Sequence, residues 1–345
     1  MLLAVLFIAI GLSLLILIHE AGHFFAAKAF GMKVEEFGFG FPPRAWSTRI
    51  GETVYSVNWL PIGGFVRLMG EVETTGGATE LLPEDLPRSF RHQTVSKRAA
   101  VIAAGVGMNF LLGWFLLSAL FSVGIPSAVV ITAVNPGSPA ETAGILPGDR
   151  IMSVPSVDAF VSAVEAAAGK EFSFTIARGS ATSTYALVPR ADPKPGEGRI
   201  GVELVEAGTV AMPFWRAAGQ GFLQSLAIMK LIFFAIFSLL GGILMGAPDF
   251  SAVTGPIGIF TAASGASSLG LLYLVQLIAL ISLNLAALNI LPFPALDGGG
   301  LALLLLEKLR GMPLSLRVER LITSVGFAAL LLLMAAITVK DILSL

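Results

Sequence analysis

Residues 2–23 read LLAVLFIAIGLSLLILIHEAGH and join an uncharged apolar run directly to two histidines and a glutamate. An apolar run of this length is typical of a helix that crosses a membrane. The alternative is a cleaved signal peptide, but the run has no basic leader or small-residue cleavage site, and it continues into His19 and Glu20. We therefore expect a first transmembrane helix over residues 1–27.

The composition also indicates a membrane protein. Hydrophobic residues make up 55% of the 345 residues and charged residues only 13%, whereas charged residues form about 25% of an average soluble domain. With a mean hydropathy of +0.84, an ordinary soluble enzyme is excluded. The net charge of −1 argues against nucleic acid as a partner. The chain has no cysteine, which excludes disulfides, cysteine-ligated zinc and thiol catalysis.

Three further apolar segments have the length of membrane spans, at residues 99–123, 269–291 and 321–339. The first of these contains small residues that let helices pack closely, namely Gly105, Gly107 and Gly113. The sequence therefore predicts a polytopic α-helical membrane protein with about four transmembrane helices.

Residues 231–247 are apolar as well, but Lys230 precedes them. A short span, a re-entrant segment and a helix lying in the membrane interface all fit this pattern, and we favour the interface. Lysine and arginine are concentrated in residues 28–98 and 301–320, so both segments are expected to be cytoplasmic. Residues 126–206 and both termini then lie outside; four spans satisfy this alternation, and five would break it.

Residues 126–206 differ from the rest because Pro, Gly, Ser, Thr and charges return. A helical stretch at 157–168 lies among short β-like runs, which are Val129–Val134, Phe172–Ala177, Thr182–Val188 and Ile200–Leu204. The sequence from Asn135 to Ile151 resembles the PDZ signature, in which a short helix leads to a "GD-x-I" turn and strand.

In the permuted bacterial form of the PDZ domain, the carboxylate-binding loop comes near the end, and Arg199-Ile200-Gly201-Val202 fits it. The resemblance implies a domain that binds an extended peptide, often a C-terminus, by adding a strand to its sheet edge. The alternative is an inert β-rich spacer.

Residues 34–70 combine alternating apolar residues with Gly and Pro, as in Phe37-Gly-Phe-Gly-Phe41, and predict a small hairpin array. Its apolar content suggests that the array dips into the membrane beside the first helix, where irregular backbone must line a cavity or be buried in protein. An edge strand there would pair with a substrate; a purely structural hairpin is the alternative. Residues 71–97 are polar and are expected to form a loose linker.

His19-Glu20-Ala21-Gly22-His23 is the HExxH pattern. Because residues i and i+4 share one face of a helix, both imidazoles reach one metal ion, and Glu20 is placed to take a proton from a metal-bound water. The alternative is hydrogen bonding to polar groups of the third span, yet ionisable groups inside a membrane are functional candidates by default. The remaining histidine, His92, lies in a polar loop and is expected to be solvated.

Catalytic zinc takes three protein ligands and keeps one position for water, so the third ligand here must be a carboxylate. The candidate is Asp297, within Asn289-Ile-Leu-Pro-Phe-Pro-Ala-Leu-Asp-Gly-Gly-Gly300. Pro292 and Pro294 end the third helix at the membrane edge, and the glycines let the backbone turn tightly. The alternative is an aspartate that caps a helix starting near Gly299.

These elements together resemble the site-2 protease family of intramembrane zinc metalloproteases, of the bacterial type that regulates sigma factors. The matching motifs are HEAGH at 19–23, one PDZ domain, Thr254-Gly-Pro-Ile-Gly258 and N-x-x-P-x-P-x-L-D-G-G at 289–299. They follow the family's order along nearly the whole chain. One departure is Gly105-Val-Gly-Met-Asn109, where many relatives have Gly-Pro before x-x-Asn.

The resemblance implies roles for six residues: His19, His23 and Asp297 as zinc ligands, Glu20 as catalytic base, and Asn289 and Pro294 as support for substrate or active-site geometry. It also implies a bacterial cytoplasmic membrane. The expected division is helix one (1–27), a cytoplasmic β loop and linker (28–98), helix two (99–123), the PDZ domain (126–206), an interfacial segment and loop (207–268), helix three with the LDGG motif (269–300), a cytoplasmic loop (301–320) and helix four with the tail (321–345).

The implied function is a zinc-dependent intramembrane endopeptidase that uses a zinc-activated water, with Glu20 as general base. Its partners would be the lipid bilayer, single-span substrates such as anti-sigma factors or remnant signal peptides, and a peptide or C-terminus at the PDZ domain. The first rival is a membrane-anchored PDZ scaffold with a non-catalytic metal site. The second is a metal transporter or sensor, although such proteins are usually built from repeated halves and the sequence shows no repeat.

Overall fold

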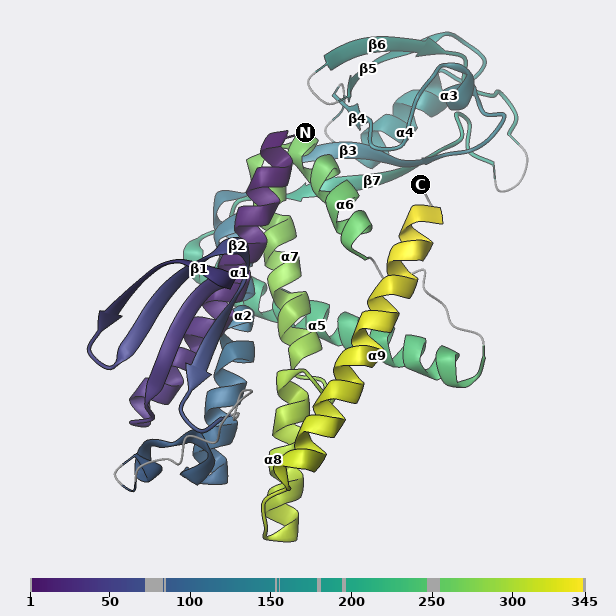
Figure 1. Cartoon of the computed structure of the whole chain (residues 1–345). Helices are drawn as coiled ribbons and strands as arrows, with labels where there is room; N and C mark the ends of the chain where they lie inside the picture. Colours follow the sequence, from purple (N-terminus) through teal and green to yellow (C-terminus); the bar gives the residue numbers. More distant parts are fainter. Residues whose placement is uncertain are drawn as a thin grey trace. The chain divides into compact units, whose positions relative to one another are not determined.

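The computed structural model describes residues 2–71, 83, 85–152, 154, 156–178, 181–193, 197–246 and 255–343. The chain forms two compact units, one with residues 1–116, 222–263 and 277–345, the other with residues 117–221 and 264–276. The larger unit contains most of the long helices and a small sheet. The smaller unit contains a five-stranded sheet and two short helices (Figure 1).

Among the described residues, five helices are long and apolar enough to cross a membrane, one more than the four expected. They are α1 (Leu2–Ala29), α2 (Val95–Val123), α5 (Phe214–Leu244), α7 (Leu271–Asn289) and α9 (Leu316–Leu343). Two shorter helices, α6 (Pro256–Leu269) and α8 (Asp297–Arg310), precede and follow α7. The chain is thus a multi-pass membrane protein, and the number of crossings stays a prediction.

Helix α5 contains the apolar segment that we expected to lie in the interface. Lys230 is exposed and divides the helix, and the apolar part that follows ends at Leu244, short of the about 20 residues that a span needs. Within the larger unit, the part of α5 after Phe222 runs crosswise to α9 (Figure 1). The helix as a whole is nevertheless long and apolar enough to cross, so its position in the interface stays a prediction.

Two of the three glycines expected at helix contacts in α2 lie at such contacts. A Cβ on Gly105 would lie 2.3 Å from His23 Nε2, and one on Gly113 would lie 2.6 Å from Leu283 Cγ of α7. A Cβ on Gly107 would meet nothing within 4 Å, so the expectation was wrong for that residue. Gly22 completes the contact from the side of α1, where a Cβ would lie 2.4 Å from the carbonyl oxygen of Ala104.

The hairpin array expected over residues 34–70 is confirmed. Strands β1 (Val34–Ile50) and β2 (Thr53–Leu68) are antiparallel, and the first half of β1 pairs with both halves of β2. Phe37 therefore lies opposite Val66 on one side and opposite Tyr55 on the other. The Phe24 ring of α1 packs against Phe37 and Tyr55, with centroid distances of 5.1 and 6.0 Å. This contact fixes the sheet to the helix that carries HExxH.

The expectation of a loose linker over residues 71–97 was wrong from residue 85 onward. The segment forms two short 3₁₀ helices, Leu86–Arg88 and Phe90–His92. Phe90 is buried in a cluster with Phe24 and Val101, and its N–H donates to the Met69 carbonyl at 2.8 Å. One buried aromatic is enough to anchor this otherwise polar segment. Residues 72–82 and 84 lie outside the described residues.

The smaller unit is an antiparallel sheet with the order β6-β5-β4-β3-β7. Its strands are β3 (Ile125–Val134), β4 (Arg150–Ile151), β5 (Phe172–Arg178), β6 (Ala181–Leu187) and β7 (Val202–Thr209). Each of the four expected β-like runs overlaps one of these strands, and β4 is the strand of the GD-x-I segment.

Two helices pack on this sheet, α3 (Pro139–Thr142) and α4 (Val157–Ala166). Each begins after a serine, Ser138 or Ser156, whose hydroxyl accepts a hydrogen bond from a first-turn N–H. Phe160 of α4 is buried in the core of the unit, against which Val202 and Leu204 of β7 also pack. Strand β7 is an edge strand that lies beside α4.

Candidate metal centre

Two imidazoles face each other on α1. His19 and His23 are both 9% exposed, and their Nε2 atoms are 3.2 Å apart. The spacing i, i+4 puts them on one face of the helix. The two rings are nearly perpendicular, with an interplanar angle of 86°. Each ring therefore turns one nitrogen toward the same point.

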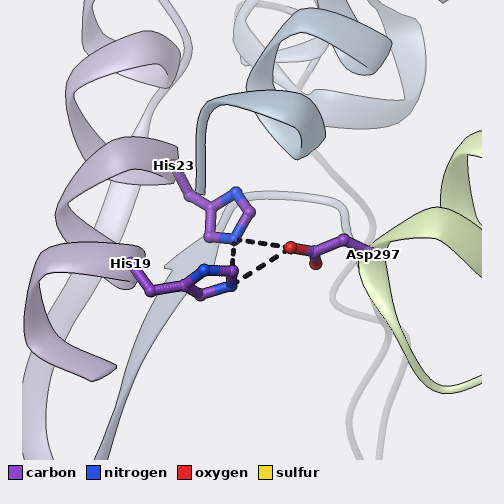
Figure 2. A group of neighbouring side chains, drawn as sticks. All are labelled: His19, His23 and Asp297. Carbon is purple, nitrogen blue, oxygen red and sulfur yellow. Dashed lines mark hydrogen bonds and ion pairs between the residues drawn. The ribbon is translucent and has the colours of Figure 1, made fainter. Parts of the chain in front are cut away.

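Asp297 completes the group from the first residue of α8 (Figure 2). Its Oδ2 lies 3.1 Å from His19 Nε2 and 3.6 Å from His23 Nε2. The N-cap of α8 is Leu296, and no side chain caps the helix, so the capping alternative for Asp297 is wrong. Oδ2 is buried, and apart from these two imidazole nitrogens it has no partner in the described structure. While both nitrogens carry lone pairs, nothing donates to this buried carboxylate oxygen, which is costly, and a cation would satisfy it.

The chain reaches this point through a tight turn between α7 and α8. Ala295 adopts a positive φ of 75°. Gly298 and Gly299 are helical residues, so they do not themselves form the turn; instead, a Cβ on either would lie 2.1–2.2 Å from the carbonyl oxygen of Leu291 or Phe293. The glycines are needed because the preceding turn folds back onto the start of the helix. This corrects the expectation that they turn the backbone.

His23 is oriented by a backbone carbonyl. Its Nδ1 lies 2.9 Å from the oxygen of Val101 in α2. A carbonyl only accepts, so Nδ1 must carry the proton and Nε2 is left with a free lone pair. This is the usual way in which a metal-binding histidine is held by a neighbour.

His19 has a corresponding neighbour in Asn109, which is fully buried. Asn109 Nδ2 lies 3.2 Å from His19 Nδ1, and Asn109 Oδ1 has no partner in the described structure. When Nε2 of His19 binds a metal, Nδ1 carries the proton and needs an acceptor. Rotation of the amide by half a turn gives it one, because Oδ1 then takes the place of Nδ2. Ser282 of α7 donates to the Asn109 carbonyl at 2.7 Å and supports this part of α2.

Gly105 leaves room for both rings. A Cβ at this position would lie 2.3 Å from His23 Nε2 and 2.9 Å from His19 Cε1. Helix α2 therefore leaves space for the rings at Gly105 and supplies the Val101 carbonyl and the Asn109 amide to the site. Sequence reasoning missed the roles of Val101 and Asn109; an amide within an apolar span was the one available signal.

Glu20 is partly exposed and lies next to the histidines. Its Oε2 accepts a hydrogen bond of 3.1 Å from the backbone N–H of Val66 in β2. Its carboxylate is not part of the group of ligand atoms, which consists of His19, His23 and Asp297, all within 4.8 Å of one another.

The other residues named from the sequence take up separate positions. Pro294 packs against α9, where a Cβ on Gly326 would lie 2.3 Å from its Cβ. Asn289 is the last residue of α7. His92 is exposed and lies 3.3 Å from the Ser89 hydroxyl; it is not brought to the group.

Arg199, Ile200, Gly201 and Val202 lie together in the smaller unit, at the start of β7. The Arg199 guanidinium donates to the carbonyls of Arg190 and Ala191, so it holds its own loop. Ile200 is buried in the core, and a Cβ on Gly201 would lie 2.3 Å from Ser138 Cβ.

A second carboxyl group near the centre is Glu71, just after β2. Burial raises the pKa of Glu71 from 4.5 to about 7, and the negative charges of Asp297 and Glu319 add to the rise.

The chemistry of the three converging ligands fits zinc. The two imidazole nitrogens and the Asp297 carboxylate oxygen form a donor set that suits this metal, with one position left open. The buried Oδ2 of Asp297 and the proton placement on His23 agree with that assignment.

The comparisons with known proteins agree with the site. The protein-family model described as peptidase family M50 matches residues 7–333 of this chain. Two relatives described as candidate zinc metalloproteases are a Nostoc protein, 34% identical over 96% of this chain and 93% of its own, and a Clostridium perfringens protein, 31% identical over 98% of both. The zinc metalloprotease RasP of Shouchella clausii is 30% identical over 97% of both chains.

Proposed function

The chain belongs to peptidase family M50, and from this we propose that it is a zinc-dependent endopeptidase that cuts the transmembrane segments of single-span proteins. The observation that carries the proposal is the convergence of His19 Nε2, His23 Nε2 and the buried Asp297 Oδ2 beside Glu20. Anti-sigma factors and remnant signal peptides are the substrate classes that the family resemblance suggests.

His19, His23 and Asp297 would hold the zinc ion. When bound, zinc supplies a Lewis acid that lowers the pKa of water and polarises a peptide carbonyl. The Val101 carbonyl keeps the imidazole proton of His23 on Nδ1, and Asn109 does the same for His19 once its amide is rotated so that Oδ1 faces Nδ1, so that both Nε2 atoms stay available. Glu20 accepts the proton of the attacking water and returns it to the amine that leaves.

The substrate must unwind before it is cut, because a transmembrane helix uses its own carbonyls in hydrogen bonds. Asn289 has no side-chain hydrogen bond in the described part of the chain, so its amide is available for a freed substrate backbone. Pro294, packed on α9, keeps the turn before Asp297 in place. The sheet beside α1 offers an edge to an extended substrate.

The sheet also contacts lipid in this proposal. Trp46 and Trp59 are 59% and 71% exposed, and Phe41 and Leu60 are exposed beside them. Aromatic residues are favoured at the membrane interface. The hairpins therefore dip into the membrane beside α1, on the cytoplasmic side together with residues 301–320.

The outer topology can be tested directly because the chain has no native cysteine. Single cysteines in residues 126–206 and near either terminus are expected to react with an impermeant reagent from outside, and those in residues 301–320 only from the cytoplasm. In the proposed topology, α5 lies in the interface and ends on the outer side of the membrane. If Gly246→Cys were labelled only from the cytoplasm, this position of α5 would be excluded.

We propose that residues 126–206, within the smaller unit, form a PDZ domain. Its edge strand β7 lies beside α4 and leaves an edge to which a peptide can be added. Arg199 is used within its own loop, so the N–H groups at Ile200–Val202 are the donors left for a terminal carboxylate. The domain acts as a docking site or a size filter that admits trimmed substrates. Deletion of residues 126–206 tests the filter: if untrimmed substrates still escape cleavage, the filter lies elsewhere.

The deciding experiment is cleavage of a model transmembrane substrate in detergent, with the zinc content measured on the same samples. We expect cleavage by wild type, none by Glu20→Gln with zinc retained, and none by Asp297→Asn with zinc lost. Zinc binding without cleavage of any substrate would instead support the scaffold. Absence of zinc from wild type would refute the site.

A further inference from the structure

The sheet makes a direct hydrogen bond to the proposed catalytic base. The backbone N–H of Val66 donates to Glu20 Oε2 at 3.1 Å. In the described part of the chain, this is the one hydrogen bond to the Glu20 carboxylate. A bond between an N–H and an ionised carboxylate is charge-assisted and stronger than a neutral one.

The strand passes close along α1 at this point. A Cβ on Gly64 would lie 3.5 Å from Glu20 Cγ and 3.8 Å from Ile16 Cγ2. Ile16 and Glu20 share one face of α1, since they are four residues apart. The contact between Val66 and Glu20 therefore belongs to a continuous interface between helix and strand.

The direction of the Val66 N–H follows from the pairing of the sheet. The second half of β2 pairs with β1 along one side, where Val66 lies opposite Phe37. Along an antiparallel strand, N–H groups point alternately toward and away from the partner. Because the Val66 N–H donates to Glu20, it points away from β1. Loss of the Val66 N–H would therefore remove no hydrogen bond between β1 and β2.

We propose that the backbone N–H of Val66 is a positioning group that holds the Glu20 carboxylate in the orientation needed to take a proton from water. The inference rests on the proposed function. A glutamate side chain has three rotatable bonds, and a proton acceptor works only when its geometry is correct. The sheet thereby becomes part of the catalytic apparatus, because any shift of β2 withdraws the group that orients the base.

The test compares Val66→Pro, which lacks the N–H, with Val66→Ala, which keeps it and loses side-chain packing. Proline is tolerated in an edge strand where the N–H points away from the ladder. We expect Val66→Pro to lower kcat by about tenfold or more with KM within about twofold, because substrate binding does not need an oriented base. Zinc content should match wild type. Equal kcat values for the two variants would overturn the proposal.

Hydrogen exchange provides a second readout that does not depend on activity or on a proline variant. The Val66 amide should exchange about tenfold faster or more in Glu20→Ala than in wild type. The amides of the ladder around Tyr55 should not change. Equal exchange at Val66 would overturn the contact itself. If wild type cuts no substrate, the proposed function fails, and the exchange experiment still decides whether the contact exists.

Discussion

Arg98 of α2 and Glu307 of α8 form a largely buried ion pair, in which one guanidinium nitrogen, Nη1, donates to both carboxylate oxygens at 2.8 and 3.0 Å. Arg98 is 7% exposed, and its guanidinium also lies over the Phe90 ring. The pair joins the helix that orients both histidines to the helix that begins with Asp297. It therefore supports the centre from outside.

Removing one partner of this pair should destabilise the protein strongly. Arg98→Ala leaves the Glu307 charge buried without a partner, and such losses cost about 3–5 kcal/mol. The double variant Arg98→Met/Glu307→Leu should recover most of the loss, because it removes both charges and keeps apolar volume. Denaturant unfolding in detergent measures both. A double variant as unstable as the single one would show that the charges themselves are required.

Gly105 and Gly107 form a matched pair for testing the space around the imidazoles. A Cβ on Gly105 would lie 2.3 Å from His23 Nε2, whereas one on Gly107 would meet nothing within 4 Å. Gly105→Ala should cost about 1–3 kcal/mol through overpacking and reduce bound zinc. Gly107→Ala should leave zinc content unchanged, and both are measured by metal analysis of purified protein. Normal zinc content in Gly105→Ala would contradict the geometry.

Asn109 should tune metal affinity without binding the metal. Asn109→Leu removes the side-chain amide that lies beside His19 Nδ1, and loss of such a neighbour weakens metal binding by about 10–100-fold. Ser282→Ala is the control, since among the described residues its hydroxyl donates only to the Asn109 backbone carbonyl. Competition with a chelator gives both affinities. If the two variants bind zinc equally well, Asn109 does not orient His19.

Glu71 should make the stability of the metal-free protein depend on pH. Its pKa is raised from 4.5 to about 7, so between these values the folded state keeps a proton that the unfolded chain releases. Stability should therefore fall as the pH rises through that window. Glu71→Gln cannot titrate, and its unfolding midpoint should change less between about pH 5 and about pH 8. Equal pH dependence in both proteins would assign the effect to other groups.

The sequence was informative wherever a side chain carries the chemistry. The convergence of His19 and His23 could be predicted from their spacing alone, because a helix puts i and i+4 on one face. Asp297 could be proposed because the chain offers no further histidine in an apolar segment and two prolines mark the end of a helix. In both cases the residue type and its local pattern contain the information.

Sequence reasoning could not reach contacts that depend on backbone atoms or on distant segments. Val101 and Val66 act through a carbonyl and an N–H, which every residue has, so no side chain marks them. Asn109 needed the pairing of α1 with α2 to be recognised as a neighbour of His19. Phe90 orders a segment whose composition is otherwise that of a linker, since a single buried ring outweighs the polar residues around it.

The distance along the chain between the histidines and Asp297 has a consequence for biogenesis. Translation proceeds from the N-terminus, and domains generally form as their residues emerge. The helix with both histidines enters the membrane early, whereas α8 is made near the end. If the proposed ligand set is correct, the nascent chain has two of its three ligands during most of its synthesis and completes the centre only when α8 is made.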